Sequence, residues 1–190
     1  LAEIQGSPSF SSTGDISHPE TNRQSAAAIL KPLEANPDKS PELLLALGEL
    51  YAELASASFY IDFETDRAIA EDQTSLDYYK AYLEQRPDDT KQRFKYLAID
   101  GDLGSVLYRN GQSDEAVARL ERVTSELEAL LKDHPDNVDF LYGLGRTQRM
   151  QSEVLLNTGH PQEAVDAASA GLATMEKIHA LIPAETPAYW

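Results

Sequence analysis

The side chains best suited to catalysis in this sequence are its four histidines, and their spacing argues against a shared site. They are His18, His134, His160 and His179. Catalysis needs a nucleophile, a base and an orienting group in one cluster. These histidines are spread along the chain, and no His-x-x-x-His pair of the kind that holds zinc occurs. We interpret them as solvated or capping side chains, and we expect no catalytic residue, no metal ligand and no cofactor.

Two short motifs resemble ligand-binding loops. Asp62-Phe63-Glu64-Thr65-Asp66 has the alternating carboxylates of a calcium loop, but Arg67 and Gln73 stand where an EF-hand needs Gly and Glu. We interpret this stretch as an acidic helix start, which the helix dipole favours. The segment 101–104 reads Gly-Asp-Leu-Gly without a following Gly-Lys-Ser/Thr, so close helix packing explains its glycines better than phosphate binding.

Composition excludes several classes of protein. The 190 residues include 16 Lys or Arg against 32 Asp or Glu, which gives a net charge of −16. An acidic chain is repelled by nucleic acid and by anionic membrane surfaces. The absence of cysteine excludes disulfides and thiolate-bound metals. No run reaches the roughly 18 apolar residues of a membrane-spanning helix, so we expect no insertion into a membrane. The sequence is compatible with a cytoplasmic location, or with an extracytoplasmic one if the chain follows a membrane helix in the full-length protein.

The elements that position these residues are organised by an internal repeat. Pro37, Pro87, Pro135 and Pro183 are separated by 50, 48 and 48 residues, and three of them precede Asp. Gly111 and Gly159 repeat at the same interval of 48, each followed after a few residues by Glu-Ala-Val. Agreement between independent markers on one period indicates stacked structural repeats.

Between the markers, apolar residues recur at helical spacing. In 113–133 they fall at i, i+4 and i+7 intervals, and 161–182 carries a similar stripe that includes Leu172. Gly111 and Gly159 stand where a helix end needs positive φ. Ser113, as an N-cap, and Pro161, as a first-turn proline, are expected to begin the following helices. We predict an all-α fold of about seven helices, stacked as antiparallel hairpins in one domain over residues 1–190. Its parts are an irregular stretch 1–22, a partial repeat 23–37, repeats 38–87, 88–134 and 135–183, and a stub 184–190.

These repeats resemble the tetratricopeptide repeat. Leu47-Gly48 with Tyr51, Leu103-Gly104, Gly111, Ala116 and the closing prolines carry the resemblance. It implies a right-handed α-solenoid that binds protein or peptide partners. The usual unit of that family is about 34 residues, so both helices must be longer here. In the last unit Gln151-Ser152 stands where Leu-Gly is expected, and Leu144-Gly145 lies earlier.

A narrower resemblance covers about thirty residues of the first third. Ile4–Phe10, Gly14-Asp15 and the helix from Ala26 to Leu33 resemble the tetratricopeptide tails of bacterial serine/threonine protein kinases. No kinase motif occurs in this chain. The resemblance implies an accessory or sensory tail of a larger protein, with no catalytic domain in this chain.

The resemblance also implies a partner-binding groove lined by the first helices of the repeats. Aromatic residues gather nearby, in an insertion peculiar to the 38–87 unit and, as Tyr78, Tyr79 and Tyr82, on the helix that returns from it. We read them either as an ordinary core or as a docking patch for a basic or amphipathic partner, because that unit has eleven acids and four bases. The candidate residues of the groove and of the aromatic patch are Glu49, Tyr51, Glu53, Phe59, Tyr60, Phe63, Tyr108, Arg109, Arg149 and Glu153.

Two other functions stay open from the sequence. A homodimer could form through the apolar stripe of 164–182 with Tyr189 and Trp190. A small-ligand-binding helical domain would need a deep cavity lined by converging polar groups.

Overall fold

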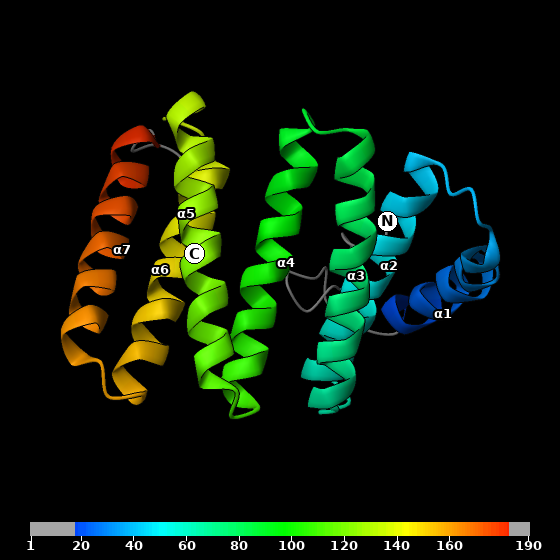
Figure 1. The fold of residues 1–190 in the computed structure, drawn as a ribbon, viewed down its shortest axis with the longest axis horizontal. Helices are drawn as coiled ribbons and strands as arrows, with labels where there is room; N and C mark the ends of the chain where they lie inside the picture. Colours follow the sequence, from blue (N-terminus) through cyan, green and yellow to red (C-terminus); the bar gives the residue numbers. More distant parts are fainter. Residues whose placement is uncertain (1–17, 183–190) are drawn as a thin grey trace. The chain divides into compact units, whose positions relative to one another are not determined.

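The computed structural model describes residues 18–182, and every regular element in that part of the chain is helical (Figure 1). The elements are α1 (His18–Leu30), the 3₁₀ helix η1 (Lys31–Ala35), α2 (Pro41–Tyr60), α3 (Thr65–Gln85), α4 (Thr90–Arg109), α5 (Ser113–Asp133), α6 (Val138–Asn157) and α7 (Pro161–Leu181). Consecutive long helices are joined by short turns and pack as antiparallel hairpins, which confirms the predicted all-α class.

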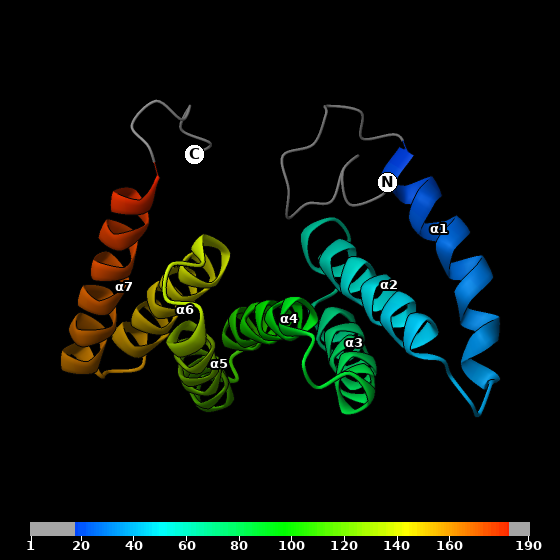
Figure 2. The same cartoon turned by 90° about the horizontal axis from the view of Figure 1, so that it is seen from above.

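The chain forms two compact units, Leu1–Ile99 and Asp100–Trp190, whose border lies within α4. In the first unit α2 contacts both α1 and α3. In the second unit α6 contacts both α5 and α7. Figure 2 shows the helices of both groups from above. The middle helix of each group is therefore covered from two sides.

Local sequence explains where three of the helices begin. The Ser40 hydroxyl accepts a hydrogen bond from the backbone N–H of Leu43 at 3.3 Å and caps α2. The Asn137 side chain caps α6 in the same way, from Phe140 N–H at 3.0 Å. Such caps satisfy backbone donors that the first helical turn leaves unpaired. Pro161 opens α7 as predicted.

Ser113 begins α5 as predicted, but the cap position belongs to Gln112, which makes no side-chain capping hydrogen bond there. The predicted start of the first helix is wrong. α1 already begins at His18, so the stretch predicted to be irregular through Asn22 is helical at its end. Glu20 explains the earlier start, because it lies in the first turn of α1 and pairs with Arg23.

The two hairpins of the second unit turn through a glycine with positive φ, as predicted. Gly111 has a φ of 82° and Gly159 a φ of 87°. The following backbone N–H reaches back to the helix at both turns: Gln112 donates to Leu107 O at 2.9 Å, and His160 donates to Leu155 O at 2.9 Å. The turn between α2 and α3 has no glycine. There Phe63 takes the left-handed conformation, with a φ of 58°.

A Leu-Gly pair lies at the point where the helices of each hairpin come closest. A Cβ placed on Gly48 would stand 2.8 Å from Tyr79 Cδ2, and one on Gly104 would stand 3.1 Å from Leu120 Cδ2. Gly145 lies in the same way against Met175 of α7. The register of the last hairpin is therefore set by Leu144-Gly145 and not by Gln151-Ser152.

Burial of the predicted apolar stripes differs between α5 and α7. Ala116, Leu120, Val123 and Leu127 of α5 are all buried. On α7, Leu172 is 63 % exposed although it belongs to the predicted stripe. In the described part of the second unit α7 packs along α6, and its flank at Leu172 lies outside that contact.

Candidate functional site

The predicted aromatic patch divides into a core part and an exposed part. Tyr79 and Tyr82 of α3 are 1 % and 8 % exposed. Tyr51, Phe59 and Tyr78 are half-buried. The two readings of the patch therefore apply to different residues: the returning helix supplies core rings, and the turn supplies surface rings.

Tyr51 and Tyr78 form a stacked pair between α2 and α3, with ring centroids 5.9 Å apart. The Tyr51 hydroxyl donates a hydrogen bond to Glu34 Oε1 at 2.8 Å. Burial, this hydrogen bond and the Glu34 charge raise the pKa of Tyr51, and burial with the same charge raises the pKa of Tyr78. Lys31 lies 5.7 Å from the centre of the Tyr51 ring. These contacts attach η1 to the α2–α3 hairpin, which is a structural role.

The exposed rings belong to residues 60–63, which we name the α2–α3 tip. Tyr60 is 53 % exposed, Ile61 is 51 % exposed and Phe63 is 81 % exposed. Phe59 packs edge-on against Tyr60, with ring centroids 4.9 Å apart. Large apolar side chains next to one another are uncommon on the surface of a monomeric protein.

Buried polar contacts hold the two helices together behind the tip. The Ser58 hydroxyl donates a 2.6 Å hydrogen bond to Glu71 Oε2, and both residues are buried. Arg67 pairs with Glu71 and with Glu64, at 3.0 Å each. The turn is therefore tied to α3 by a charged network that the sequence pattern did not predict. The sign of this network in the sequence is Glu71, an acid within the apolar stripe of α3.

The surface around the tip is acidic. Residues 40–66 include six acids and no Lys, Arg or His. Glu49 is paired with Lys95 of α4 at 2.8 Å, and Glu53 is half-buried. Asp62 and Asp66 are exposed beside Phe63. An anionic field around apolar side chains favours partners with positive charge.

The remaining groove candidates lie in the second unit. Tyr108 is half-buried and Arg109 is exposed at the end of α4. Arg149 and Glu153 are exposed on α6 and form an ion pair of 3.6 Å along one helix. Exposed pairs of this kind contribute at most about 1 kcal/mol. The ten predicted residues are thus divided between the two units, with six on α2 and its turn and four on α4 and α6.

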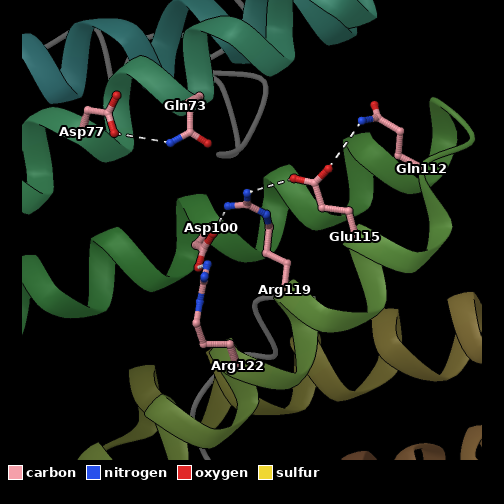
Figure 3. Close-up of polar contacts among 7 residues, drawn as sticks. All are labelled: Gln73, Asp77, Asp100, Gln112, Glu115, Arg119 and Arg122. Atoms are coloured by element: carbon pink, nitrogen blue, oxygen red, sulfur yellow. Dashed lines mark hydrogen bonds and ion pairs between the residues drawn. The ribbon is translucent and has the colours of Figure 1, made fainter.

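A buried charge network in the second unit was not predicted. Asp100 of α4 is fully buried and pairs with Arg119 and Arg122 of α5 (Figure 3). Arg119 also reaches Glu115 at 3.4 Å. Figure 3 includes a separate contact within α3, from Gln73 to Asp77 at 3.4 Å. Asp100 stands within an apolar stripe, and its partners come from the next helix, so spacing along α4 does not reveal them.

Asp102 forms a second ion pair of the same unit, with Arg146 of α6. Loss of solvent around its carboxylate raises the pKa of Asp102, and Arg146 opposes that shift. Every carboxylate in these networks has a guanidinium partner. They connect α4 to α5 and α6.

The described residues offer neither a metal site nor a membrane span. Between residues 18 and 182, no three His, Asp or Glu side chains are grouped so that they could hold a metal ion. In the same range, no helix is long and apolar enough to cross a bilayer.

Comparisons with known proteins do not assign this chain to a family. No protein-family model and no curated protein matches the chain. Among solved structures, the crystal structure of MamA aligns with 90 % of this chain and 99 % of its own, at 18 % identity and a TM-score of 0.39. An alignment at this score does not establish a shared fold.

Proposed function

We propose that this chain is a non-catalytic, tetratricopeptide-like scaffold that binds a protein partner through the acidic and aromatic surface of its first unit. The observation that carries this proposal is the α2–α3 tip, where three large apolar side chains are more than half exposed. They lie beside a stretch, residues 40–66, that has six acids and no base. Apolar anchors provide binding energy, and the surrounding charge selects the partner and speeds the encounter.

The helical architecture supports a scaffold over an enzyme. Polar residues buried in the hairpins are used to join helices, as Ser58 and Glu71 do. Ser75 likewise donates to the carbonyl of Gly48 at 2.7 Å. These groups hold a surface in place and are not directed at a substrate.

We further propose that this scaffold is one part of a larger protein. The resemblance of residues 4–33 to kinase tails supports an accessory or sensory tail of a larger bacterial protein, such as a serine/threonine kinase. Residues 4–17 of that segment lie outside the described residues. The division into repeats at residues 37, 87 and 134 is proposed on the sequence period. Reading the gene upstream of Leu1 tests the context: a kinase domain supports it, and an unrelated module contradicts it.

The binding proposal is tested with a synthetic helical peptide of leucines and lysines, and with its leucine–glutamate counterpart. We expect the lysine peptide to perturb backbone amides of residues 41–66 in NMR spectra of the full chain. The double variant Glu53→Lys with Asp62→Lys should slow association by about threefold or more at low ionic strength. It should also flatten the dependence of that rate on salt.

A matched control keeps the change in net charge equal. Glu121→Lys with Glu128→Lys reverses two exposed acids on α5, in the second unit. We expect a smaller effect on the rate than from the first double variant. Equal effects of both variants, or amide perturbations confined to the second unit, would show that only net charge attracts the peptide.

Self-association is the second candidate, because α7 carries an exposed apolar flank. Val165 is 59 % exposed and Leu172 is 63 % exposed, and the two are seven residues apart on one face of the helix. Tyr189 and Trp190 lie outside the described residues. Sedimentation velocity tests this candidate: a dimer that Leu172→Glu dissociates supports it, and a monomer at high concentration rules it out.

A further inference from the structure

The α2–α3 turn uses a phenylalanine where the hairpins of the second unit use glycine. The φ angle is 58° at Phe63, 82° at Gly111 and 87° at Gly159. Among residues 18–182, Phe63 alone has a side chain and a positive φ. This conformation is unfavourable for any residue with a Cβ, and a bulky residue there is an outlier. Glycine would make the same turn without strain.

The ring of Phe63 does not offset this strain by packing. Its side chain is 81 % exposed, the largest exposure among the exposed apolar residues of the described chain. The turn itself is held by other groups: Glu64 N–H donates to Ser58 O at 2.8 Å, and Arg67 joins Glu64 to Glu71. The fold therefore does not need a ring at position 63. Strained residues kept at an exposed position point to a contact outside the chain.

The shape of the tip decides what kind of surface can cover it. The tip lies at the end of the α2–α3 hairpin (Figure 1), and Phe63 and Ile61 are both more than half exposed there. Projecting side chains lose most of their contact with water only inside a concavity. The occupant must therefore supply a pocket, which an extended peptide cannot do by itself.

The negative charge of the tip determines which side chains are expected at the rim of that pocket. Asp62 stands between Ile61 and Phe63, and its side chain is exposed. The nearest basic residue, Arg67, is already paired with Glu64 and Glu71. Burying the tip against an uncharged or acidic rim would remove the Asp62 carboxylate from water without supplying a partner for it. A rim of Lys or Arg would supply one.

We propose that the α2–α3 tip inserts Phe63 and Ile61 into an apolar pocket, rimmed by basic side chains, on a folded partner protein. This inference rests on the proposed binding function of the first unit. It adds that, at this site, the chain supplies the inserted side chains and the partner supplies the pocket.

The probe for this proposal is β-cyclodextrin, a sugar ring whose apolar cavity admits a phenyl ring. An amino-substituted form carries ammonium groups on its rim, and a sulfated form carries negative charge. We expect the amino form to shift the amide NMR signals of residues 60–66 in the full chain. Its dissociation constant should be at least about tenfold lower than that of the sulfated form.

Two substitutions distinguish the contribution of the Phe63 ring from that of its backbone conformation. Phe63→Gly removes the ring and relieves the turn, whereas Phe63→Ala removes the ring and keeps the strained backbone. Both should abolish the shifts at the tip, and Phe63→Gly should unfold at a temperature no lower than the parent chain. Ile29→Ala is the matched control, because Ile29 is 68 % exposed on α1, and it should bind as the parent does.

Several results overturn the proposal. They are unchanged binding by Phe63→Gly, equal affinity for the amino and sulfated forms, and a parent dimer that becomes monomeric in Phe63→Gly. The last result would assign the tip to a second copy of this chain. If the cyclodextrin result fails while the lysine peptide still depends on Glu53 and Asp62, the pocket inference falls and the proposed function stands.

Discussion

The carboxylate of Asp100 on α4 pairs with the guanidinium of Arg119 on α5, and none of the Asp100 side chain is exposed. Arg122 pairs with the second carboxylate oxygen at 2.5 Å. A charge removed from water in this way is tolerated only when its partners are in place. This contact therefore fixes how α5 lies along the second half of α4.

Removing the charge of Asp100 should be strongly destabilising. We expect Asp100→Asn to lower the free energy of unfolding by about 3–5 kcal/mol, because it leaves buried arginine without its partner. Arg122→Ala should lower it by less than about 1 kcal/mol, since that side chain is 50 % exposed. Urea denaturation measures both. Equal losses from the two variants would show that the burial of Asp100 does not determine how much the ion pair contributes to stability.

Adding a methyl group at Gly48 should also destabilise the fold. The new Cβ would stand 2.8 Å from the ring of Tyr79, which is 1 % exposed and has no room to move. Overpacking costs about 1–3 kcal/mol and the better helix propensity of alanine returns about 1. A net loss is expected from Gly48→Ala. Gly104→Ala should lose less, because its 3.1 Å neighbour is the flexible side chain of Leu120. Thermal unfolding ranks the two.

The Tyr82–Asp89 hydrogen bond should make stability depend on pH. The Tyr82 hydroxyl donates to Asp89 Oδ2 at 2.7 Å, which lowers the pKa of Asp89 and raises the pKa of Tyr82. Because the folded pKa of Asp89 lies below its unfolded value of about 3.9, its carboxylate stabilises the fold above that value. This stability is lost as pH falls through the folded pKa.

The variant Tyr82→Phe tests this dependence. We expect the pKa of Asp89 to rise toward its ordinary value in a carboxyl ¹³C NMR titration. The free energy of unfolding should fall by about 1 kcal/mol at neutral pH, with a smaller loss in acid. Tyr142→Phe is the control, since Tyr142 is 52 % exposed on α6. An unshifted Asp89 titration in Tyr82→Phe would contradict the assignment.

Replacing Phe63 by glycine should stabilise the chain even though it deletes a large side chain. Relief of the left-handed conformation is worth about 1–2 kcal/mol, and the greater freedom of glycine in the unfolded chain offsets about half of it. Phe63→Ala keeps the strain and should be close to neutral. Gly111→Ala, at a φ of 82°, should lose about 1 kcal/mol. Chemical denaturation compares the three, and a loss in Phe63→Gly would show that the ring supports the fold.

The helices could be predicted because their signals are local. The bounds of α5 agree with the prediction at both ends, since its apolar stripe begins just after Gly111 and ends near Pro135. The Leu-Gly pairs likewise mark where helices cross. In the last hairpin the choice between Leu144-Gly145 and Gln151-Ser152 needed the contact with Met175.

What could not be predicted depends on pairs of residues far apart in the sequence. Ser58 and Glu71 meet across a turn, and Asp100 meets arginines 19 and 22 residues later. Aromatic residues at helical spacing do not tell which ring is buried, so Tyr79 and Phe63 could not be separated in advance. The left-handed backbone at Phe63 has no local signal either, because turns of this kind ordinarily contain glycine.

The turns at Gly111 and Gly159 have nearly the same φ, the same 2.9 Å closing hydrogen bond and open space around them. They lie 48 residues apart. A gene segment cut at these two codons therefore encodes a block whose two ends match in backbone geometry. Tandem insertion of that block at either turn should lengthen the array by one repeat, and a fluorescent label inserted at either glycine should leave the helices undisturbed. Gly111 and Gly159 are therefore suitable positions at which to join an additional repeat to the chain.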